Sequence, residues 1–425
     1  MIGEGIRVQA RRALEALRNG VPNRDAVRVL GCGQTAVEEA FDRQLAAAVE
    51  LLPQNRQAEG LLVSGGFGTG KSHLLEYLQH QALQAGFVCS KVVISKETPL
   101  YDAAKVFRAA VESAEVPGIR GQAVKELALR LRPETSSFQA FERWAMEEDN
   151  GISQLLAATL ALHTRMRNDP DLEEKVTNFW AGDPLPVSDV RTGLKQCGMA
   201  TAYSIKSVPV KQLQHERFLF FSRLVLGAGF KGWVLLIDEV ELVGRYSLLQ
   251  RGKSYGELAR WLGKVEGLAY PGLTAVAAIT DDYDISVLDQ KGDSDYVGAK
   301  LREKGTEEMM RLAAWAEAGM RAIKREAMPL DRPTDETLRS THERVRDVHA
   351  RAYDWSPPDA DGASSTGSRP MRAYIRRWIN EWDLRRLYPD AMVETVEEEL
   401  HPTYIEDSSL EVASEESAEE PVPGS

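Results

Sequence analysis

A glycine-rich loop from Gly65 to Ser72 restricts the possible folds of this chain more than any other feature. The loop follows a short apolar run, Leu61–Ser64, that suits a buried parallel strand, and it precedes a helical pattern. Its spacing is that of a P-loop: Gly65, four residues, and then Gly70-Lys71-Ser72. Glycines let backbone N–H groups turn toward phosphate oxygens, and the following helix adds the partial positive charge of its N-terminus. The pattern therefore predicts a nucleotide-binding α/β domain.

The P-loop residues have distinct expected roles. Lys71 should reach the β- and γ-phosphates of ATP, and the Ser72 hydroxyl should ligate Mg²⁺. Contacts to the nucleotide are expected from Gly66, Phe67, Gly68, Thr69, Gly70, Lys71, Ser72 and His73. The predicted cofactors are therefore ATP and Mg²⁺.

The second half of such a site is expected where a buried strand ends in an acid. Asp238-Glu239, directly after the apolar run Leu235–Ile237, fits this pattern best. Asp238 would hold Mg²⁺ through water, and Glu239 would polarise the attacking water, since a general base must lie near the proton it removes. The added glutamate favours an ATPase over a passive nucleotide binder, and no acceptor-site pattern supports a small-molecule kinase.

A polar sensor and positively charged side chains should complete the site. Thr280 ends another apolar run and should emerge at the same sheet edge as the acidic pair, where it could sense the γ-phosphate; Asp281 is the alternative. Arginines stabilise transition-state charge in such enzymes. Arg372 is the candidate within the same chain, and Arg321 and Arg325 are candidates for action on a neighbouring subunit. The simpler interpretations are a strand-ending threonine and solvated surface arginines.

Apolar runs alternate with helical patterns along most of the chain, which predicts an α/β fold with a parallel sheet. Strands are expected at residues 61–64, 87–94, 233–237, 273–279 and 327–330. We assign residues 53–330 to the ATPase core, with a large helical insertion at about 99–230. Helices at 334–353 and 370–388 should form a small C-terminal helical lid within residues 331–390, with a mobile linker at 356–358 and 364–368 between them.

The first 52 residues are expected to form an N-terminal helical segment, with helices near 4–18 and 36–52. Glycine-containing breaks at 20–23 and 30–33 separate these helices. We expect the segment to pack beside the nucleotide, with Val21 and Pro22 in contact with it. A helix-turn-helix element that reads DNA is the alternative.

Negative charge is concentrated at the C-terminal end. Residues 391–425 contain eleven acidic side chains and no Lys or Arg, so without them the formal charge rises from −12 to −1. Such a Glu/Ser/Pro-rich stretch cannot bury enough apolar surface to offset its ordering entropy, and we expect it to be a disordered acidic tail. A solubilising tail is the simpler interpretation, and a tail that docks on a basic partner is the alternative.

The remaining composition argues for a cytoplasmic protein. Cys32, Cys89 and Cys197 are odd in number and widely spaced, which fits reduced thiols better than disulfides or a zinc site. No run of about 18 apolar residues could span a membrane, and the N-terminus lacks an apolar signal core. We therefore expect no membrane partner.

Several stretches together resemble the bacterial BREX-type P-loop ATPases, specifically their smaller BrxD-like branch. They are Gly20–Asn23, Gly65–His73, Leu236–Glu239, Lys253–Leu258 and Met371–Leu384. The resemblance covers about residues 1–390 and implies an AAA+-like ATPase of a phage-defence gene cluster, distantly similar to origin-recognition initiators. It implies defence-system partners such as a helicase, methylase or protease-like protein, and DNA as the ultimate target. Initiators often carry a winged-helix DNA reader after the lid, which this chain's pattern lacks, and the acidic end would repel phosphates.

Two functions fit these features. An oligomeric motor or remodelling ATPase that acts on DNA or a DNA-bound partner is favoured by Glu239. An ATP-gated switch or scaffold that organises a defence complex without motor activity is favoured by the lack of a recognisable DNA reader. The helical insertion is a candidate specificity module or a simple enlargement of the core.

Overall fold

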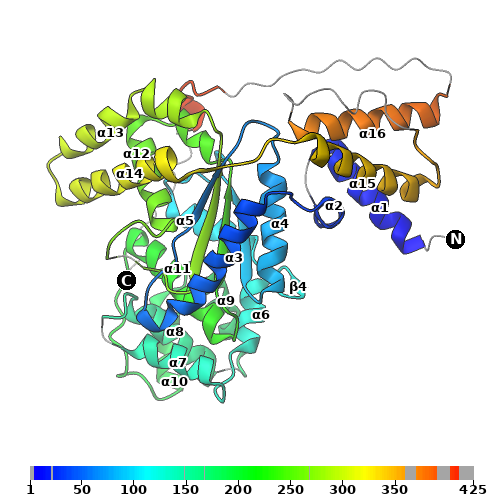
Figure 1. Cartoon of the computed structure of the whole chain (residues 1–425). Coiled ribbons are helices and arrows are strands. Elements are labelled where there is room, and N and C mark those ends of the chain that lie inside the picture. The colour runs from blue at the N-terminus through cyan, green and yellow to red at the C-terminus, as the bar shows by residue number, and fades with distance from the viewer. Residues whose placement is uncertain are drawn as a thin grey trace.

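The computed structural model describes residues 4–20, 23–147, 149–166, 168–267, 269–358, 370–389 and 403–410. They form an α/β body with a seven-stranded sheet and a lobe of helices beside it (Figure 1). The strands are β1 (Leu61–Ser64), β2 (Val88–Val93), β3 (Glu115–Val116), β4 (Ile119–Arg120), β5 (Trp233–Asp238), β6 (Leu273–Ile279) and β7 (Met328–Pro329).

The sheet order is β4-β3-β2-β5-β6-β1-β7. The five neighbouring strands β2, β5, β6, β1 and β7 are parallel to one another. All five predicted strands are present. The two-residue strands β3 and β4 form an antiparallel hairpin at one edge, which was not predicted because two residues carry no periodicity. The strands β2, β5 and β6 lie on one side of β1 in the sheet, and the later strand β7 lies on its other side. The direction in which the chain adds strands therefore reverses at β1. Open α/β sheets bind ligands at the carboxyl ends of strands at such a point.

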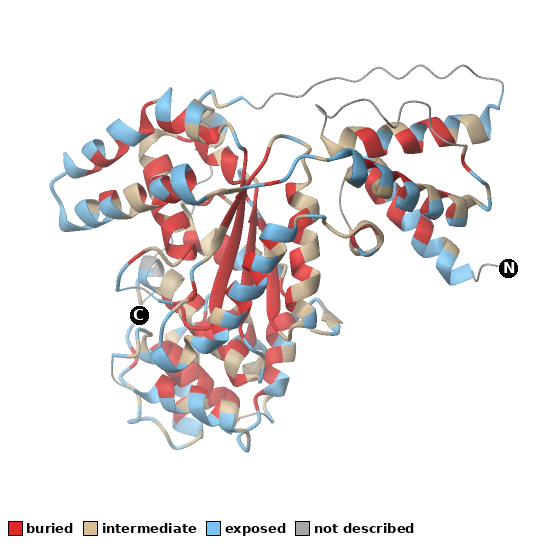
Figure 2. Ribbon diagram, in the orientation of Figure 1, coloured by how far each residue is buried: buried red, intermediate tan, exposed pale blue. Residues whose placement is uncertain are grey.

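Both faces of the parallel strands are buried (Figure 2). On β5, Trp233, Leu235 and Ile237 belong to one hydrophobic cluster, and Val234 and Leu236 belong to the cluster on the other face. The second face is covered by α3 (Thr35–Glu50) and α4 (Lys71–Gln84). The first is covered by α5 (Ala103–Glu112), α11 (Val210–Gly227), α12 (Leu248–Trp261) and α14 (Glu307–Glu326).

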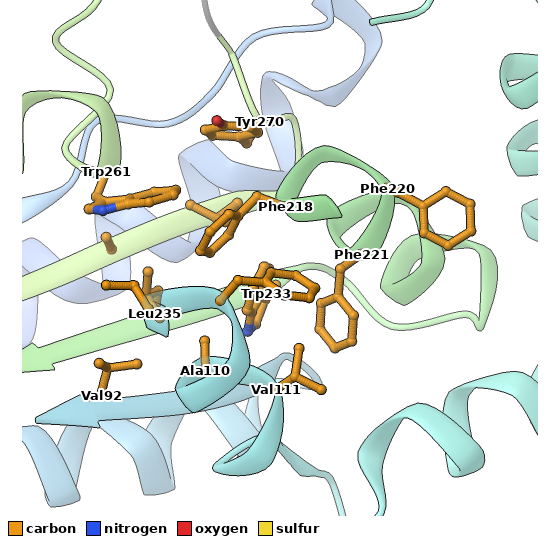
Figure 3. Close-up of a cluster of buried hydrophobic side chains, with 14 of the residues drawn as sticks. Val92, Ala110, Val111, Phe218, Phe220, Phe221, Trp233, Leu235, Trp261 and Tyr270 are labelled. Carbon is orange, nitrogen blue, oxygen red and sulfur yellow. The ribbon is translucent and has the colours of Figure 1, made fainter. Parts of the chain in front are cut away.

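Aromatic side chains fill the first face near the start of β5 (Figure 3). Phe218 of α11 lies over Trp233, and its ring centroid is 4.2 Å from that of Trp261. Phe221, also on α11, meets Trp233 with the two ring centroids 4.6 Å apart. Burying such rings removes a large apolar area from water, so this cluster fixes α11 and α12 against the sheet.

The predicted helical insertion lies between β2 and β5. Besides α5 and α11 it contains the hairpin β3–β4 and five helices, which are α6 (Ala123–Arg130), α7 (Ser136–Met146), α8 (Gln154–Arg165), α9 (Pro170–Ala181) and α10 (Val187–Gln196). Its buried side chains join the cluster on the first face of the sheet. The insertion therefore enlarges the core of the body. The helix α13 (Asp293–Arg302) lies elsewhere, beside α14.

The helical lobe combines helices from the N-terminal part of the chain with the last two α-helices that the structure describes. It consists of α1 (Glu4–Asn19), α2 (Arg24–Leu30), α15 (Asp335–Tyr353) and α16 (Met371–Leu387). Leu14, Leu338, Val345 and Trp382 share a hydrophobic cluster that is distinct from those of the sheet. The N-terminal segment, expected as one unit over residues 1–52, is thus divided: α1 and α2 join the predicted lid, and α3 packs on the sheet. Of the predicted linker, residues 364–368 lie outside the described residues.

Candidate functional site

The P-loop connects the carboxyl end of β1 to the first turn of α4, as the sequence predicted. Gly68 and Gly70 have φ angles of 79° and 107°, which a side chain would strain. The Gly65 N–H donates to the Ile279 carbonyl of β6 over 3.1 Å, and the Thr69 hydroxyl donates to the Gly66 carbonyl over 2.9 Å. The loop is therefore fixed to the neighbouring strand and closed on itself.

Lys71 begins α4, and its side chain is buried. Its ammonium donates to the Gly65 carbonyl over 2.8 Å and lies 3.5 Å from a carboxylate oxygen of Glu241. The cation is thus held inside the curve of the loop, where a bound phosphate would approach it. Ser72, the next residue, is half-buried in the same turn.

The acidic pair lies at the carboxyl end of β5, two strands from β1. Asp238 is buried, and its carboxylate accepts a hydrogen bond from the Glu239 N–H over 3.0 Å. Glu239 has a left-handed backbone, with φ at 62°, which is rare for a residue with a side chain and is common at functional sites. Burial raises the pKa of Glu239, and the Asp238 charge adds to this, while Lys71 opposes it. A carboxyl group with a raised pKa is a better proton acceptor for catalysis.

Glu241 is a third carboxyl group at this edge, which the sequence analysis missed. Burial raises its pKa to about 7, although Lys71 acts in the opposite direction. It belongs to a 3₁₀ turn, Val240–Arg245, whose other members Val240 and Val243 are buried. Its place between the apolar residues Val240 and Leu242 was the signal available in the sequence.

Thr280 follows β6, and its side chain is buried beside the acidic edge, where it was expected. Its hydroxyl contacts the Tyr404 hydroxyl at 2.6 Å. Asp281, the alternative sensor, lies closer to the P-loop, because a Cβ built on Gly66 would be 3.6 Å from its carboxylate oxygens. The contact with Tyr404 corrects one prediction: residues 403–410, within the segment expected to be disordered, pack on the body. The rest of residues 391–425 lies outside the described residues.

Arg372 reaches the P-loop from the lobe. A Cβ built on Gly68 would lie 3.4 Å from the Pro370 Cβ and 3.8 Å from the Arg372 Cβ. The guanidinium donates to the Asn19 carbonyl over 3.2 Å. The lobe therefore brings this arginine beside the loop of its own chain.

Arg321 and Arg325 are exposed on α14, the helix that leads into β7. Among the described residues, neither makes a hydrogen bond or ion pair with the P-loop of the same chain. Their solvent-facing position is compatible with contact to another molecule.

Another expected nucleotide contact, His73, faces away from the loop's phosphate-binding side. The ring of His73 points to the N-terminal segment, where a ring nitrogen is 2.7 Å from the Gly31 carbonyl oxygen. Burial lowers its pKa, so it is held as the neutral imidazole. Val21 and Pro22 lie outside the described residues. Phe67 lies at the exposed tip of the P-loop.

One protein family matches over most of the chain: BREX system ATP-binding protein BrxC/D, over residues 6–184 and 210–359. The chain belongs to this family. The resemblance seen in the sequence motifs is thereby confirmed, and ATP is the ligand that the family description names. Neither a curated protein nor a solved structure matches the chain.

The site of this BREX ATP-binding protein offers oxygen ligands for a magnesium ion. Within the described residues no three His, Cys, Asp or Glu side chains cluster as a metal site. Mg²⁺ does not require such a cluster, since it keeps several waters and binds one or two protein oxygens together with phosphates. The Ser72 hydroxyl and the buried Asp238 carboxylate are ligands of this kind. The residues present therefore fit the ion expected from the sequence.

The described part of this BREX protein contains no helix with the length and apolar character needed to cross a membrane. This finding agrees with the absence of a long apolar run in the sequence.

Proposed function

We propose that this BREX family member is an AAA+-like ATPase that binds and hydrolyses MgATP. The observation that carries the proposal is the meeting of Lys71 with the carboxyl groups that follow β5, at the point where the strand order reverses. Lys71 and the P-loop amides bind the phosphates, and Ser72 and Asp238 hold Mg²⁺ with its waters. The ion would neutralise charge that develops on the phosphates. Glu239 orients and deprotonates the attacking water.

The buried setting of the carboxyl groups supports turnover over passive binding. Burial and the Asp238 charge raise the pKa of Glu239, and the Lys71 charge acts in the opposite direction. Such opposed shifts are typical of acid–base groups in active sites. A passive nucleotide site has no need for a strained glutamate at this position.

An oligomeric motor or remodeller in BREX-type antiviral defence, acting on DNA or a DNA-bound partner, is the function that we favour. Arg321 and Arg325 are exposed one helical turn apart on α14, which suits fingers directed at a neighbouring subunit. The alternative is an ATP-gated switch or scaffold within a defence complex. Its support is the docked C-terminal segment, which can report a local change without any motor action.

ATP turnover, measured with and without DNA at increasing protein concentration, separates these functions. A motor or remodeller should show activity per molecule that rises with concentration and with DNA. An Arg321→Ala/Arg325→Ala double variant should bind ATP normally and lose turnover, then regain part of it when mixed with Lys71→Ala subunits. Turnover strictly proportional to concentration, from a chain that stays monomeric with ATP and Mg²⁺, would favour the switch.

A further inference from the structure

The C-terminal segment Thr403–Leu410 packs on the body near α12 (Figure 1), with Tyr404 next to Thr280 at the carboxyl end of β6. The Tyr404 hydroxyl donates to a carboxylate oxygen of Asp282 over 2.8 Å and contacts the Thr280 hydroxyl at 2.6 Å. Its ring meets the ring of Tyr283 edge-on, with centroids 5.7 Å apart. Because Tyr404 uses its own proton on Asp282, the proton shared with Thr280 is that of Thr280.

Two acidic side chains of the segment reach two arginines of the body. Glu406 lies 2.6 Å from the guanidinium of Arg251, and Asp407 lies 2.7 Å from that of Arg245. The Asp407 N–H also donates to the Arg245 carbonyl over 3.0 Å. Leu410 packs against the hydrophobic core at the end of the contact. The segment is therefore bound by charge, backbone and apolar contacts together.

The body surface is shaped in advance for such a segment. Arg251 is buried, and Asp293 holds it through both of its carboxylate oxygens, so its remaining N–H groups have a fixed direction. Gly244 provides the space for the tyrosine ring, because a Cβ built there would lie 2.9 Å from a ring carbon of Tyr404. The surface thus combines a fixed guanidinium, a hollow for a ring and a sheet-edge hydroxyl.

We propose that this surface is a binding site for an acidic, tyrosine-containing peptide segment, that residues 403–410 are its ligand, and that their binding restrains ATP turnover. The inhibitory part rests on the proposed ATPase function. Thr280 has one hydroxyl proton, and while it donates to Tyr404 it cannot donate to a γ-phosphate oxygen. Nucleotide sensing by Thr280 and docking of Tyr404 therefore exclude each other.

Release of the segment is feasible. Ile405 is 76% exposed and contributes little buried surface. The Arg245–Asp407 pair is partly open to solvent, where ion pairs contribute little.

The test uses full-length variants that leave the catalytic residues in place. Tyr404→Phe removes only the hydroxyl, and a triple variant, Tyr404→Ala/Glu406→Gln/Asp407→Asn, removes the tyrosine ring and both negative charges that face Arg251 and Arg245. We expect Tyr404→Phe to raise the basal rate of ATP turnover by roughly twofold to tenfold, the range of one hydrogen bond. The triple variant should raise it at least as much. Ile405→Ala, in the same segment but facing solvent, is the matched control and should not change the rate.

A binding measurement decides the docking independently of turnover. A fluorescent peptide of residues 403–410 should bind the triple variant, as measured by fluorescence anisotropy, and should lower the ATP turnover rate of that variant toward the wild-type rate. The peptide should bind more weakly when a non-hydrolysable ATP analogue and Mg²⁺ are present. Absence of peptide binding, or peptide binding that leaves turnover unchanged, would overturn the proposal. If the wild type and all variants failed to bind and hydrolyse ATP, the ATPase function would be refuted, and the inhibitory part of the proposal with it. Peptide binding would still test the docking site in that case.

Discussion

The sheet body and the helical lobe both reach the P-loop, but they are held there in different ways. The loop is fixed by backbone hydrogen bonds within the sheet, from Gly65 to Ile279 and from Leu330 to Ser64. Arg372 instead rests on a lobe whose hydrophobic cluster is separate from both clusters of the sheet. Groups on the body are therefore positioned before ATP arrives, whereas the contribution of the lobe depends on how the lobe sits.

The lobe touches the body through few polar contacts. His73 on α4 meets the Gly31 carbonyl just after α2, and Arg24 on α2 pairs with Glu115 of β3 over 2.8 Å. Small contacts of this kind permit rigid-body displacement of one part against another. We therefore expect variants of the body to affect binding and chemistry outright, and variants of the lobe to affect them by smaller factors.

Replacement of Lys71 should have the largest effect. Lys71→Ala removes the buried cation that we expect to face the phosphates, so ATP affinity should fall by at least about 100-fold, or about 2.7 kcal/mol. Isothermal titration calorimetry measures this directly. Because the substitution also leaves Glu241 buried without its cation, Lys71→Ala/Glu241→Gln serves as the control for folding. ATP affinity that survives in both variants would exclude Lys71 from the site.

Glu239→Gln should separate chemistry from binding. The amide keeps the size of the side chain but cannot accept the proton of water, so turnover should fall about 10²–10⁴-fold while ATP affinity stays near that of the wild type. Single-turnover measurements with labelled ATP follow both quantities. The neighbouring Glu241→Gln is the matched control and should stay within a few-fold of the wild-type rate. Equal losses in the two variants would contradict a special role for Glu239.

Arg372→Ala tests the lobe. One charge-assisted hydrogen bond to a phosphate corresponds to about 1.5–3 kcal/mol, and exposure reduces this, so we expect ATP affinity to fall about tenfold. Arg376→Ala, an exposed change on the same helix, is the control. If Arg372→Ala were as severe as Lys71→Ala, the lobe would be as firmly positioned as the body, and the proposed difference between the two would be wrong.

Glu241→Gln should have the smallest effect on activity and a distinct effect on stability. The pKa of Glu241 rises from 4.5 to about 7 in the fold, so between these values the native state keeps a proton that the unfolded chain releases. Its contribution to stability is therefore lost as the pH rises through that window, by on the order of 3 kcal/mol. Unfolding in urea at pH 5 and pH 7.5 should show a smaller loss of stability in the variant than in the wild type. Identical pH dependence would mean that Glu241 ionises normally.

The chemistry-bearing residues of the body could be predicted because their signals are local. A P-loop has a fixed spacing, and a buried strand that ends in Asp238-Glu239 places both acids at the edge of a parallel sheet. Among the five parallel strands, β1, β5 and β6 follow from largely apolar runs whose faces are both covered, whereas β2 includes Ser90 and Lys91 and β7 is short. Backbone geometry and strand direction are enough to bring these groups together once the sheet forms.

The position of Glu241 and the docking of Tyr404 could not be predicted in this way. Glu241 differs from other glutamates only in its burial, which the folded body sets. Tyr404 lies in an acidic stretch whose composition is typical of disorder. Its hydroxyl nevertheless contacts a sheet-edge threonine, and the neighbouring acidic side chains bind two arginines, all more than a hundred residues away in the chain. Composition reports the average tendency of a segment and carries no information about a surface shaped to receive it.

The sequence by itself determined the α/β class, the strand positions, the P-loop and its acidic partner, since each depends on spacing between near neighbours. Only the tertiary structure decided that α1 and α2 combine with α15 and α16 into one lobe, that Arg372 lies against Gly68, and that Thr280 is engaged by Tyr404. These contacts join residues that are distant in the chain. Their free energy comes from complementary surfaces that exist only after folding, so no local pattern in the sequence encodes them.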